Sequence, residues 1–514
     1  MTLKNKRIVK NSIFLLSRTI FLTIVTLYTL REVISILGEK EFGLYNVVFG
    51  IVAMFAFINS AMMSATQRFL SISIGRNKTN GVRNTFYCSL LIHLVLAVLV
   101  GIFIYLLKDY FLNKVLNING YLNEAIVVYH FAIISIAISF LQVPFSALIT
   151  AYEKMQSFAY LAIFEGFSKL AVVYLLIYLN YNKVVLYSFF LMIISFLIFL
   201  IHVLYCFCNF NKIVRGGAFE IIESKKMIKE MLNFIGWSLI GNLSIVMRNQ
   251  GANILLNVFF GLVVNAAFAI SLTVMTAIGS LIASVSNAIN PQIFKAYAEG
   301  NLNKFYTLIS SGTRYYIYFL SLIIVPLVFF MEFILNIWMN SYPSHTVLFC
   351  QLMLVVVLVD SFSILLTSGI QANGNIKWNQ IITGSLLCFP LPIAYFLYKN
   401  EFSVNSIFYI FIFVSVVSIF TKLYFIQILT RYNLLNYLYQ VFLPSVFVVA
   451  INSFLMYSLI KVIGMPTHFF ESILFLALFG FLAILLILIF GLNSIEKNKL
   501  KVYFSKKFKN HKFY

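Results

Sequence analysis

The sequence predicts an all-α polytopic membrane protein with about fourteen transmembrane helices. Of its 514 residues, 61% are hydrophobic and 10% are charged, whereas an average soluble domain has roughly 25% charged residues. The apolar residues fall into runs close to the ~20 residues that a helix needs to cross a bilayer. Basic residues concentrate in alternate connections between these runs, which is typical of a multi-pass protein oriented by its positive charge.

Hydropathy places each expected span within a few residues. The fourteen spans are predicted at residues 12–31, 44–64, 86–107, 124–143, 158–179, 184–206, 232–257, 263–288, 307–330, 347–370, 380–398, 404–426, 440–462 and 469–492.

The distribution of Lys and Arg predicts the orientation. With the N-terminus inside, the cytoplasmic segments hold 26 of these residues and the outer segments hold seven. This asymmetry puts both termini in the cytoplasm, as an even number of spans requires. The net charge of +21 is therefore a topology signal, and no nucleic-acid partner is indicated.

The longest internal connection, residues 207–231, divides the chain after the sixth span. A weak repeat supports this division, since a shift of 223 residues aligns Gly38 with Gly261 and Tyr45 with Phe268. We expect two pseudo-symmetric six-helix lobes, residues 1–215 and 216–435, as in many transporters. Residues 436–492 would form two additional helices, and residues 493–514 a basic cytoplasmic tail.

The stretch from Asn233 to Gly261 is long enough to span the bilayer, yet it is polar along one side. Arg248 lies near its middle, where a guanidinium costs about 3 kcal/mol on insertion scales. Amides recur at helical spacing on the same face, and we expect this face to line a cavity for an anionic group. The expected sugar contacts in this cavity are Asn242, Asn249 and Asn253.

Charged residues also lie deep in other spans. Glu165 and Lys169 are four residues apart on one helix, a spacing that favours a local ion pair, so a structural pair and a ligand role both stay open. Asp360 could balance an arginine or titrate during transport. Arg18 and Arg314 lie nearer the cytoplasmic ends and could instead extend toward the headgroups. The predicted contacts for a phosphate-bearing substrate are Arg248, Arg18, Arg314 and Lys169, with Asp360 and Glu165 for charge balance or coupling.

Polar residues are most frequent in the first two spans of each predicted lobe. Hydroxyl residues recur in the first span at Thr23 and Thr26, and in the eighth at Thr273 and Thr276. These spans are candidates for a shared cleft, although small and hydroxyl residues also serve ordinary packing between membrane helices.

The sequence contains no Walker loop, no HExxH pattern and no nucleophile elbow. Its five cysteines lie in or beside apolar runs and lack the spacing of a metal site. We therefore expect no enzymatic activity, no cofactor and no metal.

One segment carries a family resemblance. It contains Leu37-Gly38, the run Glu41-Phe42-Gly43-Leu44-Tyr45, and Arg68-Phe69 before a basic Gly-Arg-Asn-Lys loop. This pattern resembles the polysaccharide-transport branch of the MOP flippase superfamily, and within it the Wzx-type O-antigen flippases. The fourteen-span layout with halves joined after span six is also similar.

The resemblance implies a MATE/MOP-like pair of six-helix bundles around a cationic cavity, with alternating access. It implies a bacterial inner-membrane flippase in lipopolysaccharide and O-antigen biosynthesis, whose substrate is an oligosaccharide repeat unit linked to undecaprenyl diphosphate. Membrane lipids, an H⁺ or Na⁺ gradient, a polysaccharide polymerase and a chain-length regulator are the implied partners. The last two spans would shape a groove for the polyprenyl tail.

Two alternatives remain. A drug or cation exporter of the same fold would need an acidic cavity, against which the excess of deep basic residues argues. A membrane glycan polymerase or ligase would need catalytic residues at the outer face, usually on a large loop, but the predicted outer segments are short.

Overall fold

The chain folds almost entirely into helices. The computed structural model describes residues 3–75, 79–118, 120–152, 154–214, 221–339, 341–373, 377–466, 469–493 and 496–497, with side chains for most positions from Phe21 onward. Within these ranges every predicted span is helical, although the second, residues 44–64, begins in the helix Leu3–Ala53 that also holds the first span and continues through a 3₁₀ turn, Met54–Ala56, into the helix Phe57–Gly75. Eleven helical stretches are long and apolar enough to cross a membrane, counted over the described residues. The protein is therefore a multi-pass membrane protein, and the number fourteen stays a prediction.

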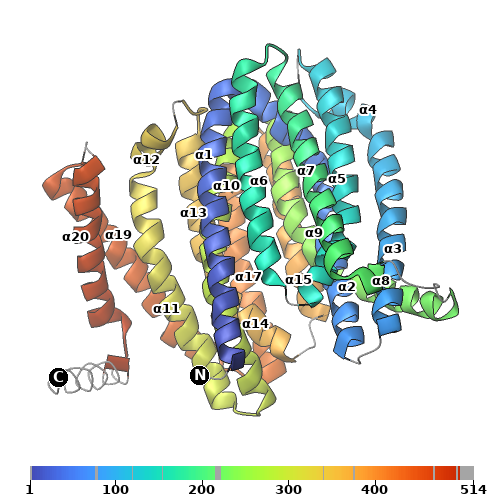
Figure 1. Cartoon of the computed structure of the whole chain (residues 1–514). Helices are drawn as coiled ribbons and strands as arrows, with labels where there is room; N and C mark the ends of the chain where they lie inside the picture. The colour runs from blue at the N-terminus through green and yellow to red at the C-terminus, as the bar shows by residue number, and fades with distance from the viewer. Residues whose placement is uncertain are drawn as a thin grey trace, which may run out of the picture. The chain divides into compact units, whose positions relative to one another are not determined.

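The helices of the first part of the chain follow the predicted spans closely (Figure 1). They are α1 (Leu3–Ala53), α2 (Phe57–Gly75), α3 (Thr79–Leu106), α4 (Lys108–Tyr110), α5 (Leu122–Ala151), α6 (Met155–Tyr178), α7 (Lys183–Asn209), α8 (Asn211–Val214), α9 (Ile221–Phe260) and α10 (Leu262–Ala298).

The later spans are more often interrupted. They are built from α11 (Leu302–Phe329), α12 (Met331–Trp338), α13 (Thr346–Ser361), α14 (Ile364–Asn373), α15 (Lys377–Cys388), α16 (Pro390–Lys399), α17 (Ser406–Thr430), α18 (Leu434–Tyr437), the π-helical turn η3 (Leu438–Phe442), α19 (Leu443–Ile463) and α20 (Phe469–Leu486).

Two glycines separate consecutive spans in the same way. Gly38 breaks the helical geometry inside α1 with φ 75°, and Gly261 separates α9 from α10 with φ 81°. Residues with side chains rarely adopt this backbone conformation. The two glycines are the pair that the 223-residue repeat aligns, so these aligned positions share a structural role. The division into lobes at residues 215 and 435 stays a prediction.

The contacts between residues divide the chain into two compact units. Unit 1 comprises Met1–Ser280, Asn336–Phe349 and Lys377–Val414, and unit 2 comprises Leu281–Leu335, Cys350–Ile376 and Ser415–Tyr514. Helices α10, α13 and α17 contribute to both units.

In unit 1, α5 packs against α2, α3 and α7, and α1 packs against α6. Gly43, in the Glu41–Tyr45 motif, lies where α1 meets the start of α10. A Cβ atom at Gly43 would be 2.0 Å from the carbonyl oxygen of Leu262. The motif glycine therefore permits a backbone approach that no larger residue allows.

In unit 2, α11 packs against α14 and α19, and α20 packs against α19. The Tyr318 hydroxyl on α11 donates to the carbonyl oxygen of Gly491 at 2.9 Å, and the Asn452 amide on α19 donates to the Ser321 hydroxyl at 2.9 Å. Large apolar side chains on α19 and α20 remain exposed, among them Phe454, Phe470 and Phe481. Such a surface is suited to contact with lipid.

Candidate functional site

Arg248 is buried within unit 1. Its side chain is 9% exposed, and its guanidinium carbon lies 5.4 Å from the centre of the Phe411 ring on α17. A cation over an aromatic face gains roughly 2 kcal/mol when it is shielded from water. The predicted polar face of α9 thus holds a buried cation, as expected from its position in the sequence. The neighbouring Asn249 is half-buried, and its Oδ1 atom has no hydrogen-bond partner.

Asn253 and Asn257, which follow on the same face of α9, have a different environment. Asn253 and Asn257 are 4% and 0% exposed. The Asn253 amide donates to the backbone oxygen of Asn46 on α1 at 3.2 Å, and its Oδ1 accepts from Asn265 on α10 at 2.7 Å. The Asn257 amide donates to Oδ1 of Asn265 at 2.8 Å, and its own Oδ1 accepts from the backbone nitrogen of Asn117 at 2.8 Å.

These hydrogen bonds form a closed network that joins α9 to α1, to α10 and to the connection after α4. The side-chain amide of Asn253 therefore forms its hydrogen bonds within the protein. This differs from the sugar contact that the sequence predicts for it. Helical spacing places residues on one face but does not say which part of that face another helix covers. The part of the face that precedes Asn253 along α9, with Arg248 and Asn249, is therefore the better candidate for contact with a substrate.

The network predicts that the side chain of Asn257 contributes to the stability of the fold and that the side chain of Asn249 does not. Asn257→Ala leaves buried groups of Asn265 and Asn117 without partners, at about 1–3 kcal/mol for each, and we expect a clearly lower melting temperature of the purified protein. Asn249→Ala removes no hydrogen bond made by the side chain oxygen and should leave the melting temperature unchanged. Equal melting temperatures for the two variants would contradict the assignment of the network as structural.

Threonines of the first and eighth predicted spans come together in unit 1. A cavity of about 360 Å³ is lined by residues of α1 and α10, namely Leu22, Thr23, Thr26, Leu27, Thr273, Thr276 and Ala277. The hydroxyls of Thr273 and Thr276 donate to backbone oxygens of their own helix, so each retains lone pairs that can accept a further hydrogen bond. The cavity joins two of the four spans predicted to share a cleft.

Other predicted site residues are placed as follows. Lys169 donates to Oε1 of Glu165 at 2.7 Å on α6, so of the two roles left open for this pair the local ion pair is the one observed. Arg18 lies in α1 one helical turn before Leu22, and Asn242 lies in α9, but their side chains are outside the described part of the structure.

Arg314 lies in unit 2 and binds a carboxylate. Its Nη2 atom donates to Oε1 of Glu496, a residue that follows α20. The acids predicted to balance the deep cations were Asp360 and Glu165, so the partner of Arg314 differs from the prediction. One feature of the sequence points to Glu496, because it is the single acidic residue after the last predicted span.

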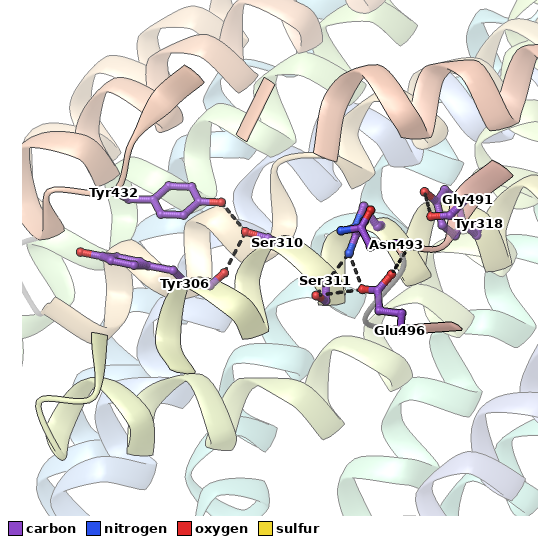
Figure 2. Close-up of polar contacts among 9 residues, drawn as sticks. Tyr306, Ser310, Ser311, Tyr318, Tyr432, Gly491, Asn493 and Glu496 are labelled. Carbon is purple, nitrogen blue, oxygen red and sulfur yellow. Dashed lines mark hydrogen bonds and ion pairs between the residues drawn. The ribbon is translucent and has the colours of Figure 1, made fainter. Parts of the chain in front are cut away.

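Arg314 and Glu496 border the larger of two described cavities, of about 900 Å³. Figure 2 labels Glu496 and several of its neighbours on these walls, among them Ser310 and Tyr432. Its walls come from α11, from the connection around α18 and η3, and from the segment after α20. The polar residues along it are Tyr306, Thr307, Ser310, Ser311, Arg314, Tyr315, Arg431, Tyr432, Asn433, Asn436, Gln440, Asn493 and Glu496. Apart from Arg314, none of these was selected from the sequence.

Asp360 is half-buried near the end of α13 in unit 2. The helix breaks directly after it, and the backbone nitrogen of Ser363 donates to the carbonyl oxygen of Asp360 at 3.0 Å. Lys422 donates to the Ser363 hydroxyl at 2.9 Å. Lys422 lies within α17. The backbone of Asp360 and the side chain of Lys422 therefore both contact Ser363 at this short break between helices.

The comparisons with known proteins agree on the fold. The MatE family model matches residues 17–175. The chain is similar to an inward-facing multidrug resistance MATE family transporter of the MOP superfamily, with TM-score 0.64, 16% identity, and coverage of 82% of this chain and 99% of that one. An outward-facing structure of such a transporter gives TM-score 0.59 and 15% identity, with 83% and 97% covered.

A MOP superfamily transporter from Pyrococcus furiosus, described as having a binding pocket of reversed polarity, is also similar. Its TM-score is 0.59 and its identity is 14%, with 82% of this chain and 95% of that one covered. No curated protein matches the sequence. At these identities the likeness establishes that the chain has the fold of the MATE transporters.

Proposed function

We propose that this chain is a flippase that moves undecaprenyl-diphosphate-linked oligosaccharide across the bacterial inner membrane by alternating access. The fold supports transport, because solved structures of this fold include inward-facing and outward-facing conformations. A diphosphate sugar headgroup cannot cross hydrocarbon unaided, since burying an unpaired charge is very costly. A transporter with a polar, cationic path removes this barrier while the lipid tail stays in the membrane.

The observation that carries the proposal is the burial of Arg248 in the apolar interior of unit 1. Ionisable residues inside membrane domains are costly, and they commonly mark a substrate path. A guanidinium recognises phosphate oxygens with two parallel hydrogen bonds. We therefore assign the diphosphate to Arg248, helped by Arg18 on the first span.

The sugar part of the substrate needs uncharged hydrogen-bonding groups. Asn249 has a buried carbonyl oxygen without a partner, and Asn242 precedes it by seven residues on α9. The hydroxyls around the α1–α10 cavity are further candidates. Because Asn253 is engaged in the asparagine network, we assign it to holding this face of α9 rather than to the sugar.

A drug or cation exporter is the second candidate, because two of the similar structures are multidrug resistance transporters. The observation on its side is Glu41 in α1, whose Oε2 atom is buried without a hydrogen-bond partner. Against it, Glu165 on α6 is neutralised by Lys169.

Deletion of the gene in its own host distinguishes the flippase from the exporter. The host itself supplies the natural sugar repeat, so the substrate does not have to be chosen in advance. The flippase predicts loss of the surface glycan and accumulation of lipid-linked repeat units in the inner leaflet, reversed by re-expression. An intact surface glycan together with increased sensitivity to cationic dyes would support the exporter instead.

Coupling to an H⁺ or Na⁺ gradient gives a further prediction. If Asp360 is the titrating group, Asp360→Asn should flatten the pH dependence of transport in proteoliposomes. Asp109→Asn, at an exposed carboxylate, is the matched control and should retain the wild-type profile. An unchanged profile in Asp360→Asn would reduce Asp360 to a structural counter-ion.

A further inference from the structure

The cavity in unit 2 contains a buried cation with incomplete hydrogen bonding. Arg314 is 3% exposed, and its Nη2 atom donates to Glu496 and, at 3.5 Å, to the Ser311 hydroxyl. Its Nε and Nη1 atoms are buried and have no hydrogen-bond partner. A guanidinium carries five N–H donors, and buried donors without partners are rare in native structures. Glu496 alone therefore leaves much of this group unsatisfied.

The cavity around Arg314 is large enough for a ligand. Its volume of about 900 Å³ is at the upper end of the ≈ 300–1,000 Å³ found for small-molecule sites. Two arginines and one glutamate are the charged residues on its walls, so the balance of charge is positive. Amides are also available at the exposed Asn436 and Gln440.

The tyrosines add hydroxyl groups to the same walls. The Tyr432 hydroxyl lies within hydrogen-bond distance of the Ser310 hydroxyl (Figure 2). Burial raises the pKa of Tyr432 above its ordinary value, with smaller lowering effects from Ser310 and Arg314, so this group is a neutral hydroxyl at physiological pH. The walls thus combine two cations with uncharged hydrogen-bonding groups, which is the chemistry that recognises a phosphate.

We propose that this cavity binds a phosphate-bearing anion, with Arg314 and Arg431 as its cationic contacts. The helices beside it favour a lipid headgroup as the source of the phosphate. Leu435 and Tyr439, next to Asn436 and Gln440, are exposed apolar residues, and so are Leu443 on α19 and Phe490 after α20. Acyl chains could therefore stay on an apolar surface while the headgroup enters the cavity. The proposal does not depend on the proposed function.

Glu496 then has a defined role at this site, as a competitor of the anion for Arg314. Its Oε1 accepts from Arg314 and its Oε2 accepts from the backbone nitrogen of Asn493 at 2.9 Å. The carboxylate partly satisfies the guanidinium, and a phosphate would compete with it for the same cation. Removing the charge of Glu496 should therefore strengthen anion binding, whereas removing the charge of Arg314 should weaken it.

Native mass spectrometry of the delipidated full-length protein in detergent tests this inference. The probes are phosphatidylglycerol, diacylglycerol as the same tails without phosphate, and inorganic phosphate. The variants are Arg314→Gln, the surface variant Arg431→Ala, and Glu496→Gln. The control is Lys461→Ala, at an exposed lysine near the other end of α19, and Arg248→Ala reports any binding of the probe in unit 1.

We expect phosphatidylglycerol to bind the wild-type protein at least about tenfold more tightly than diacylglycerol, because charge-assisted hydrogen bonds are the strong ones. We expect Arg314→Gln to weaken the binding of phosphatidylglycerol about tenfold and Arg431→Ala to weaken it about threefold. Glu496→Gln should strengthen it about threefold. Lys461→Ala should stay within about twofold of the wild type.

If inorganic phosphate binds with the same dependence on Arg314 and phosphatidylglycerol does not bind, the ligand is a free phosphate compound. If Arg314→Gln fails to fold, the test rests on Arg431→Ala and Glu496→Gln. Weaker binding of phosphatidylglycerol in the first and stronger binding in the second support the site. Affinities that do not change in any of the three variants would overturn the proposal. So would a loss that occurs only in Arg248→Ala, because the anion would then bind in unit 1.

Discussion

Arg248→Ala is expected to abolish export of the surface glycan while the protein remains inserted in the membrane. The side chain is almost fully buried in unit 1 beside the Phe411 ring, and alanine removes the cation that we assign to the substrate diphosphate. A lost charge-assisted contact of about 3 kcal/mol corresponds to roughly a 100-fold slower process. The measurement is surface glycan in the host carrying only the variant, with immunoblotting of membranes for the amount of protein.

Arg248→Lys and Lys399→Ala complete this experiment. Lysine keeps the charge but not the planar two-point geometry, so part of the export should remain. Lys399 is an exposed lysine in the last turn of α16, and its loss should leave export unchanged. Full export in Arg248→Ala would remove this residue from the mechanism.

Gly43→Ala is expected to be among the most destabilising single changes in unit 1. A Cβ atom there would lie 2.0 Å from the carbonyl oxygen and 2.8 Å from the carbonyl carbon of Leu262. Both contacts are to backbone atoms, so the start of α10 would have to move away from α1. Overpacking typically costs about 1–3 kcal/mol and occasionally more, and we expect a value at the upper end here because the clash is with backbone atoms. We expect little folded protein after purification and a melting temperature well below that of the wild type.

Gly279→Ala is the matched control, because this helical glycine of α10 has nothing within 4 Å of a new Cβ atom. Alanine in a helix interior is favoured over glycine by roughly 0.5–1 kcal/mol, so the control should be neutral or slightly stabilising. Equal melting temperatures for the two variants would show that α1 and α10 do not approach as closely as described.

The sequence predicts the helices well because length and hydropathy are local properties. Each predicted span is helical in the described residues, and the aligned glycines Gly38 and Gly261 both separate spans. The breaks inside later spans were less predictable. Proline marks the start of α16 at Pro390, but the interruption after Asp360 has no such residue.

The candidate site is predictable only where partners are close in the chain. The Lys169–Glu165 pair follows from a spacing of four residues. Arg314 meets Glu496, which is 182 residues away, and hydropathy carries no information about such a contact. The asparagines of α9 show the same limit, since their shared face is local but its coverage by Asn46, Asn117 and Asn265 depends on tertiary packing.

Transport by the purified protein in liposomes tests the central claim, that the substrate is an anionic lipid-linked oligosaccharide, most directly. The assay compares transfer of the host's own lipid-linked oligosaccharide between leaflets with movement of ethidium in the same vesicles. The flippase predicts rapid transfer of the lipid-linked sugar, loss of this transfer in Arg248→Ala, and no movement of ethidium. Movement of ethidium without transfer of the lipid-linked sugar would contradict it.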